Sequence, residues 1–275
     1  MLYFSEWLTS NKLNRDVLNQ ITFLLDKHAI KYTLLPNTKD IWARDYMPIQ
    51  VNHQNFVEYI YQPDYLIDEP NFITKTNEVC KSIGIETVKT KLILDGGNVV
   101  KYQNKAILTD KIFLENAFQF TEQEVMEELK KAFQLEYVFI IPWDTSEPYG
   151  HADGMVRFVD ENTILTHGFY RTYPTKFQAK IYEALKTLNI IELNFEVKSP
   201  DENFNWGYIN FLQTPEIILV PVFGIEEDKQ ALEQIGKAFT RYAASKMIYP
   251  INMKSFVKKG GGALNCISWE VESGN

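Results

Sequence analysis

The chain has 275 residues, 28 of them basic and 36 acidic, which gives a formal net charge of −8. Its 45% apolar and 14% aromatic residues are typical of a folded globular protein and exclude a disordered chain. The acidic balance argues against a nucleic-acid partner, which would need clustered Lys and Arg, and fits a cationic small substrate. The longest apolar stretch, residues 217–225, is much shorter than the roughly 20 residues of a membrane helix, so we expect no membrane partner.

The two cysteines, Cys80 and Cys266, are too few for a disulfide framework. We interpret both as free thiols, which are typical of a reducing compartment. The N-terminus shows no basic segment followed by a long apolar run, so it does not resemble a secretory signal. We therefore expect a cytoplasmic protein. The sequence gives no prediction of its oligomeric state.

The chain reads as one domain over residues 1–275, because no Ser/Gly-rich linker divides it. Within it, a unit of helix, strand, polar motif and two-stranded hairpin recurs five times. Four predicted helices lie over 15–28, 72–83, 176–188 and 228–242, and a further helix begins at the capping box of Thr121 and Glu124. The predicted single strands lie over 30–35, 85–94, 137–141, 190–197 and 247–251. The predicted hairpins join 48–51 to 56–61, 99–102 to 106–109 and 155–159 to 163–166, and a fourth turns at 214–216.

The polar motifs mark the period of this repeat. Taken at Asp45, Asp95, His151, Gly207 and Cys266, they are spaced by 50, 56, 56 and 59 residues, a period typical of blades or solenoid units. No polar capping repeat is evident at either end, so we predict a closed ring. The last unit lacks its second hairpin strand, and we expect residues 2–4 to supply it. The alternative is an open mixed sheet in which the spacing is a coincidence.

If each motif lies where a strand reaches the ring centre, then Asp45, Asp95, His151, Asp153 and Cys266 converge. A thiol, an imidazole and three carboxylates are the groups needed for covalent attack on a cationic sp² carbon. The carboxylates hold the cation, the thiolate attacks and the imidazole moves protons. The same carboxylates should raise the pKa of the Cys266 thiol, and a bound cationic substrate should offset that rise.

At this point the chain resembles the agmatine deiminase and Porphyromonas-type peptidylarginine deiminase family. Five stretches match its signature motifs in the same order: DIWARDYMP at 40–48, DGGN at 95–98, GHAD at 150–153, YINF at 208–211 and GGG at 260–262 leading to Cys266. The resemblance implies an α/β fold, a five-bladed propeller of ββαβ repeats with pseudo-fivefold symmetry. It also implies hydrolysis of a guanidinium group, on agmatine in putrescine biosynthesis or on arginine or peptidylarginine, without metal or organic cofactor.

The resemblance implies a role for each catalytic residue. Cys266 is the nucleophile that forms a covalent thiouronium intermediate, and His151, as a group that titrates near neutral pH, protonates the departing ammonia and then activates water. Asp45 and Asp153 bind the guanidinium nitrogens. Asp95 orients His151.

Other positions are expected to contact the substrate or shape its channel. We expect Trp42 to stack on the guanidinium or its alkyl stem. Gly261 and Gly262, in a loop that we predict to be mobile, and Asn265 beside the nucleophile are further candidate binding residues. Trp206 and Asn210 carry no acid–base group, and we expect them only to shape the channel.

Three features depart from the family pattern. Asn265 replaces the usual His before the nucleophile, Asp95 replaces a Glu, and the first repeat is short. The substrate is therefore left open between agmatine, arginine, peptidylarginine and another guanidine. Two other functions stay open as well: an amidinotransferase with the same fold, and a guanidinium-binding protein without catalysis.

Overall fold

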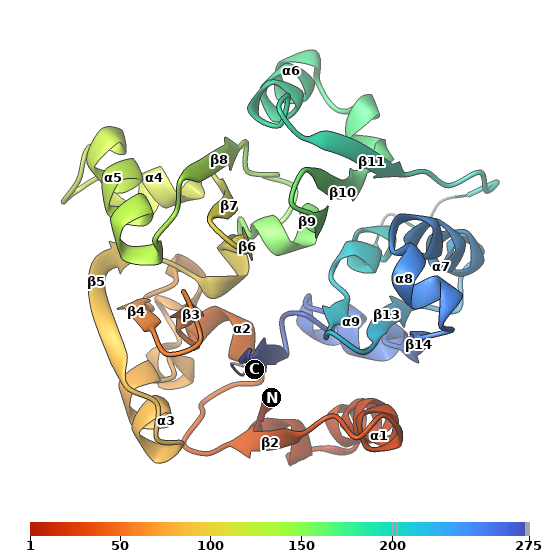
Figure 1. The fold of residues 1–275 in the computed structure, drawn as a ribbon, viewed down its shortest axis with the longest axis horizontal. Coiled ribbons are helices and arrows are strands. Elements are labelled where there is room, and N and C mark those ends of the chain that lie inside the picture. Colours follow the sequence, from red (N-terminus) through yellow and green to blue (C-terminus); the bar gives the residue numbers. More distant parts are fainter. Residues whose placement is uncertain (200, 202, 273–275) are drawn as a thin grey trace.

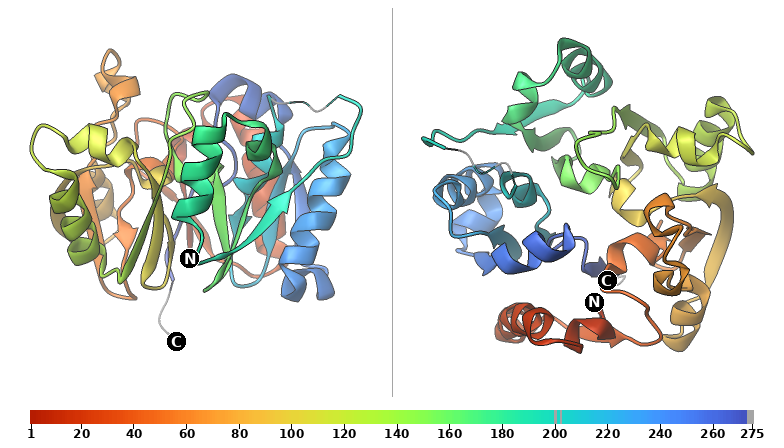
Figure 2. Two further views of the ribbon diagram at one scale, coloured as in Figure 1. Left: turned by 90° about the horizontal axis from the view of Figure 1, so that it is seen from above. Right: turned by 180° about the vertical axis from the view of Figure 1, so that it is seen from behind.

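The structure, a computed structural model, describes residues 1–199, 201 and 203–272. Within these residues, five three-stranded sheets are arranged in a ring, and helices lie on its outside (Figure 1). In the side view the strands run roughly along the axis of the ring (Figure 2). The predicted five-bladed α/β propeller is confirmed. None of the described helices is long and apolar enough to cross a membrane.

All five sheets have the same construction. A first strand pairs antiparallel with a middle strand, which pairs in parallel with a third strand after a helical crossover. In that order the sheets are β3 (Ile49–Gln50), β4 (Phe56–Ile60) and β5 (Thr87–Ile93); β6 (Val100–Tyr102), β7 (Lys105–Thr109) and β8 (Tyr137–Ile141); β9 (Val156–Asp160), β10 (Thr163–His167) and β11 (Asn189–Leu193); β12 (Leu212–Gln213), β13 (Ile218–Val222) and β14 (Ile248–Asn252); and β15 (Ser268–Glu270), β1 (Leu2–Ser5) and β2 (Tyr32–Leu35). The repeated unit is therefore ββαβ, as expected.

The crossovers carry the longer helices of the ring. These are α1 (Lys12–Lys27), α3 (Thr76–Ser82), α4 (Lys111–Asn116) with α5 (Glu122–Phe133), α6 (Thr175–Ala184), and α7 (Glu227–Ala238) with α8 (Thr240–Ala244). Helix α1 buries Val17, Ile21 and Leu25 along one face, the spacing of an amphipathic helix. Helix α5 begins at the predicted capping box, in which Thr121 and Glu124 each accept the backbone N–H of the other.

The ring closes through the two ends of the chain. Strand β1 pairs antiparallel with β15, with Leu2 opposite Glu270 and Phe4 opposite Ser268. Beyond the ladder, the N–H of Val271 donates to Met1 O at 2.9 Å. The prediction that residues 2–4 complete the last unit is confirmed, and the alternative of an open sheet is wrong.

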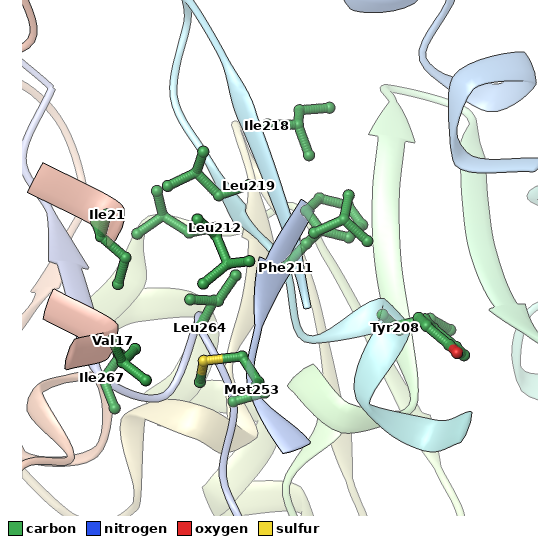
Figure 3. Close-up of a cluster of buried hydrophobic side chains, with 14 of the residues drawn as sticks. Val17, Ile21, Tyr208, Phe211, Leu212, Ile218, Leu219, Met253, Leu264 and Ile267 are labelled. Atoms are coloured by element: carbon green, nitrogen blue, oxygen red, sulfur yellow. The ribbon is translucent and has the colours of Figure 1, made fainter. Parts of the chain in front are cut away.

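The largest hydrophobic cluster supports the end of the chain that carries Cys266. Leu264 and Ile267, on either side of Cys266, are fully buried. They belong to the same cluster as Phe211 and Leu212, which follow Asn210, and as Val17 and Ile21 of α1 (Figure 3). One apolar core therefore fixes both the Cys266 turn and the neighbouring turn that ends at Asn210.

Two predicted elements differ in the structure. Strand β11 ends at Leu193, short of the predicted 197. The predicted loop at 260–262 begins one residue later, because Gly260 is the last residue of helix α9 (Lys254–Gly260), and its mobility remains a prediction. Phe256 and Val257 are buried and anchor the helix. Gly261 ends it with φ +73°, a left-handed conformation that glycine adopts without strain, and its N–H donates to Val257 O at 2.9 Å.

Candidate active site

Five short turns precede the first strands of the five sheets and lie at the same end of the ring. They are α2 (Ala43–Tyr46), η4 (Gly96–Asn98), η5 (Ala152–Gly154), η7 (Asn205–Ile209) and the turn at 264–267. Successive turns touch: α2 contacts η4, η4 contacts η5, and η5 contacts η7. Motifs about 50 residues apart in sequence therefore meet around the axis, as the repeat predicted.

His151 lies between two buried carboxylates. Its Nε2 lies 3.1 Å from Asp95 Oδ2, and its Nδ1 lies 3.6 Å from Asp45 Oδ1. Gly97 makes this approach possible, since a Cβ at that position would lie 2.6 Å from both Asp45 Oδ1 and His151 Nδ1. The contact with Asp95 fits the expectation that this residue orients the imidazole.

The charges around His151 make the imidazole a stronger base than usual. Burial alone would lower its pKa, but Asp45, Asp95 and Asp153 outweigh burial and raise the pKa to about 10. Burial also raises the pKa of Asp45 to about 8, against the opposing effect of the His151 charge. The sequence favoured a group that titrates near neutral pH, whereas the three carboxylates stabilise the charged form of His151 and raise its pKa above that range. At neutral pH the ring carries a proton that it can donate.

Cys266 lies in the turn before β15 and is buried. Its Sγ lies 3.3 Å from Asn210 Oδ1 and 3.8 Å from Asp153 Oδ2. Burial raises the pKa of the Cys266 thiol well above its ordinary value, and the charges of Asp153 and Asp45 raise it further. The sequence analysis expected a raised thiol pKa from the carboxylates alone, whereas burial is the larger cause of the rise.

Asn265 joins the nucleophile's turn to Asp153 and to a cation. Its Nδ2 donates to Asp153 Oδ2 at 2.6 Å, and its Oδ1 accepts from Arg157 Nη1 at 2.8 Å. The residue before Cys266 is thus buried behind the carboxylate. Its side-chain contacts are to Asp153 and Arg157, so it supports the expected binding carboxylate.

The thiol of Cys266 and the imidazole of His151 share charged neighbours. The charge of Asp45 acts on Cys266 as well as on His151, and that of Asp153 acts on both groups too. Asp45 Oδ1 is buried and accepts no hydrogen bond from any residue that the structure describes. A buried carboxylate oxygen without a donor is costly, and a planar cation with several N–H groups would satisfy it.

The expected substrate-contacting residues Trp42, Gly261 and Gly262 pack among aromatic side chains. A Cβ on Gly262 would lie 2.3 Å from Trp42 Cζ3, so the indole packs directly on the glycine backbone. The rings of Trp42 and Phe256 meet edge to face, with 5.9 Å between their centres. A Cβ on Gly261 would lie 3.0 Å from the hydroxyl of Tyr149. These two glycines therefore allow close packing of aromatic side chains.

Aromatic rings that the sequence did not single out cover His151. The Tyr149 ring lies 5.9 Å from the imidazole, and the Tyr65 ring lies 6.2 Å from it. Buried Lys111 joins the segments that carry Tyr65 and Tyr149. Its Nζ lies 2.9 Å from Asp64 Oδ1 and donates to Tyr149 O at 2.8 Å. Tyr65 lies in the connection after β4 and Tyr149 in the connection after β8, whereas Lys111 is the first residue of α4, after β7.

Two further residues at the site were misjudged or missed from the sequence. Asn210, which we expected only to shape the channel, contacts the sulfur of Cys266. Arg157 was missed because a polar residue that alternates with Val156 and Phe158 is the ordinary pattern of a half-exposed strand, so no sequence signal marks its contact with Asn265.

Comparison with known proteins identifies the family. The family model described as Porphyromonas-type peptidyl-arginine deiminase matches residues 9–271. A protein of Photobacterium profundum described as "Putative agmatine deiminase" is 20% identical over 228 residues, which cover 70% of this chain and 61% of that protein. The match thus spans less than two thirds of that curated relative's length.

Solved structures share the fold. The agmatine deiminase of C. jejuni superposes with a TM-score of 0.73 at 16% identity, over 99% of this chain and 93% of that one. The agmatine deiminase of Enterococcus faecalis gives 0.59 at 21% identity, over 83% and 73%. At these identities the superpositions establish the fold, and the family model covers nearly the whole sequence. The chain belongs to the Porphyromonas-type peptidyl-arginine deiminase family.

Proposed function

We propose that this chain is a cysteine-dependent deiminase, which hydrolyses a guanidinium group to a ureido group and ammonia. One observation carries the proposal. The sulfur of Cys266 lies beside the carboxylate of Asp153 and within the influence of the charge of Asp45, whose buried Oδ1 has no hydrogen-bond donor in the described part of the chain. Two carboxylates about a thiol suit a flat cation presented to a nucleophile.

In the proposed complex, Asp45 and Asp153 accept hydrogen bonds from the guanidinium nitrogens. Such charge-assisted bonds fix both the position and the plane of the group. The bound cation also offsets the negative charge that raises the pKa of Cys266. Substrate binding and formation of the thiolate are therefore coupled.

The first half of the reaction forms the covalent intermediate. The Cys266 thiolate donates an electron pair to the guanidinium carbon, and a C–S bond forms. His151, which carries a proton at neutral pH, gives it to one terminal nitrogen. The C–N bond breaks, ammonia leaves, and a planar thiouronium remains attached to the sulfur.

The second half releases the product. The His151 imidazole, now neutral, takes a proton from a water molecule, whose oxygen attacks the thiouronium carbon. The C–S bond breaks, the hydroxyl proton of the adduct passes to solvent, and the ureido product leaves with the thiolate restored. Asp95, 3.1 Å from His151 Nε2, holds the ring in place through both proton transfers.

The names of the relatives make agmatine and arginine side chains the first guanidines to test. Free arginine belongs beside them, because this chain's departures from the family pattern leave the substrate open. The predictions of a cytoplasmic location, and of a reaction without metal or organic cofactor, remain predictions.

The test is incubation with agmatine, free arginine and an arginine-containing peptide, with ammonia and ureido product measured together. We expect both products from one substrate, and neither from Cys266→Ala. Cys80→Ala is the matched control, since it removes the other thiol away from the site and should leave the rate unchanged. Transfer of the amidino group to an added amine, without ammonia, would identify an amidinotransferase instead. Binding without turnover would overturn the proposal in favour of a guanidinium-binding protein.

A further inference from the structure

We infer that Arg157 is a positioning residue of the proposed site, acting through the amide of Asn265 on the Asp153 carboxylate beside Cys266. The inference rests on the proposed function, which it deepens. Arg157 lies on β9, Asn265 in the last turn and Asp153 in η5, so the chain of contacts joins three separate segments.

The polarity of the bridge is fixed by chemistry. A guanidinium can only donate hydrogen bonds, and an ionised carboxylate can only accept them. The Asn265 amide fits between them in one orientation, with Oδ1 toward Arg157 Nη1 at 2.8 Å and Nδ2 toward Asp153 Oδ2 at 2.6 Å. If the amide were reversed, its NH2 group would face the N–H donors of Arg157 and its oxygen would face the carboxylate oxygen of Asp153. Arg157 therefore dictates that Asn265 presents its NH2 group to Asp153.

Arg157 is itself held firmly. Its guanidinium lies 4.8 Å from the centre of the Phe211 ring, and Phe211 is fully buried. Within the described residues Arg157 forms no ion pair with a carboxylate, and Asn265 is its hydrogen-bond partner. Burial and the like charge of Arg44 lower the pKa of Arg157 to about 10, which still leaves it charged at neutral pH. Its charge is therefore directed toward Asn265 and, through it, toward Asp153.

The bridge has two consequences for Cys266. It fixes Asp153 Oδ2, the oxygen 3.8 Å from the sulfur, so that the carboxylate keeps one orientation while substrate binds. It also brings a positive charge behind Asp153, where it interacts favourably with the ionised forms of Asp153 and Cys266. Without Arg157, Asp153 would be free to rotate, and the thiolate would be harder to form.

Arg157 reaches the site from the side opposite the motif turns. It lines a cavity of about 930 Å³ at the hairpin end of the ring, together with Arg44, Asn265, Asp153 and residues of the hairpin turns. The Asn265 side chain lies between it and Asp153. It therefore acts on the reaction from behind the binding carboxylate, which distinguishes it from a catalytic residue.

The test measures the thiol directly and needs no substrate. In a Cys80→Ala background, the rate of iodoacetamide alkylation of Cys266 is followed by mass spectrometry at a series of pH values. We expect Arg157→Gln to slow alkylation about tenfold at a given pH, the effect of one pKa unit. Arg157→Lys, which keeps the charge but not the fork of donors, should recover part of that rate.

Two further variants separate positioning from general damage. Arg241→Gln is the matched control, because Arg241 lines the same cavity but donates to Pro215 O, away from Asn265. It should alkylate like the parent. Asn265→Ala should slow alkylation as much as Arg157→Gln, and the double variant should be no slower than either single one, since both break one chain of contacts. If Arg157→Gln does not fold, Asn265→Ala and Arg157→Lys decide the question.

The inference is overturned if Arg157→Gln or Asn265→Ala alkylates at the parent rate, or if Arg241→Gln is slowed equally. Once a substrate is known, kcat should fall more than KM rises in Arg157→Gln, because the arginine does not touch the substrate. A parent protein without hydrolase activity would refute the proposed function, yet the alkylation rates would still decide the role of Arg157.

Discussion

The side-chain oxygen of Asn210 lies 3.3 Å from Cys266 Sγ and accepts a hydrogen bond from Cys266 N, also at 3.3 Å. It accepts the backbone N–H of Asn265 as well, at 3.1 Å. One buried amide therefore fixes the backbone of the nucleophile's turn and contacts the sulfur. Because this oxygen is neutral, it approaches the sulfur without the full repulsion that a third carboxylate would bring.

We expect Asn210→Ala to lower kcat/KM at least tenfold and to cost about 1–3 kcal/mol of unfolding free energy, because the buried Cys266 N–H loses this acceptor, while Asn265 N–H keeps the Asn210 backbone O. Steady-state kinetics and urea unfolding measure the two effects. Asn203→Ala, an exposed asparagine near the same turn, is the control and should change neither. If Asn210→Ala has the same kcat/KM as the unmodified protein, this amide does not act on the nucleophile.

The close approach of Asp45 and His151 across Gly97 gives a second prediction. A Cβ at Gly97 would lie 2.6 Å from an atom of each side chain, so Gly97→Ala must push them apart. Displacements near 1 Å can cost roughly 100-fold in rate, and we expect a loss of that order in kcat with the fold retained. Circular dichroism and kinetics together check it.

Gly236→Ala is the matched control for Gly97→Ala. Gly236 lies in α7, where a Cβ would make only ordinary contacts, the nearest at 3.6 Å to Ala243. An alanine there favours the helix and should leave the activity unchanged. Equal activity in the two variants would contradict the role given to Gly97.

The ring and its convergence were predictable because they depend on repetition. The first strand of the last sheet had no partner in its own unit, so residues 2–4 were the remaining candidate, and β1 does pair with β15. The period of the motifs placed Asp45, Asp95, His151 and Cys266 at equivalent points of successive sheets, and equivalent points of a ring meet at its axis.

The remaining site residues depend on packing that has no period. Tyr65 lies in a connection whose path follows from tertiary contacts, and Lys111 begins α4, so neither the approach of Tyr65 to His151 nor the bond from Lys111 to Tyr149 left a sequence pattern. Asn210 carries no acid–base group, so the sequence analysis expected it only to shape the channel and missed its contact with the Cys266 sulfur. Helix α9 is short and begins without a side-chain cap, and buried Phe256 and Val257 hold it in place.

The two perturbed groups beside the thiol predict an alkaline pH optimum. Burial raises the pKa of Asp45 to about 8, so Asp45 becomes the carboxylate that holds a cation only as pH rises through that value. Against the effect of burial, the carboxylates raise the pKa of His151 to about 10, so it loses its donatable proton above that value. We therefore expect kcat/KM to rise as the pH passes about 8, and the raised pKa of the Cys266 thiol shifts the optimum further in the alkaline direction. An optimum below pH 7 would contradict this assignment.

Lys111 links the aromatic cover of His151 to the fold. Its ammonium is buried, bonds the Tyr149 carbonyl at 2.8 Å, and lies 2.9 Å from Asp64 Oδ1 and 3.5 Å from Glu115 Oε1. Burial raises the pKa of Glu115 to about 8 against the opposing charge of Lys111, so the comparison is made above that pH, where Lys111→Met leaves an ionised Glu115 carboxylate buried without its cation. We expect a loss of about 3 kcal/mol in unfolding free energy, measured by urea denaturation, together with a lower kcat/KM.

The double variant Lys111→Met/Glu115→Gln separates the two roles of Lys111. Neutralising Glu115 removes the unpaired buried charge, so most of the lost stability should return. The bonds from the ammonium to Asp64 and Tyr149 stay absent, so the segments that carry Tyr65 and Tyr149 remain loose over His151. We therefore expect stability to recover while kcat/KM stays low. Recovery of both would mean that Lys111 only balances the charge of Glu115, and that the cover over His151 is held by other contacts.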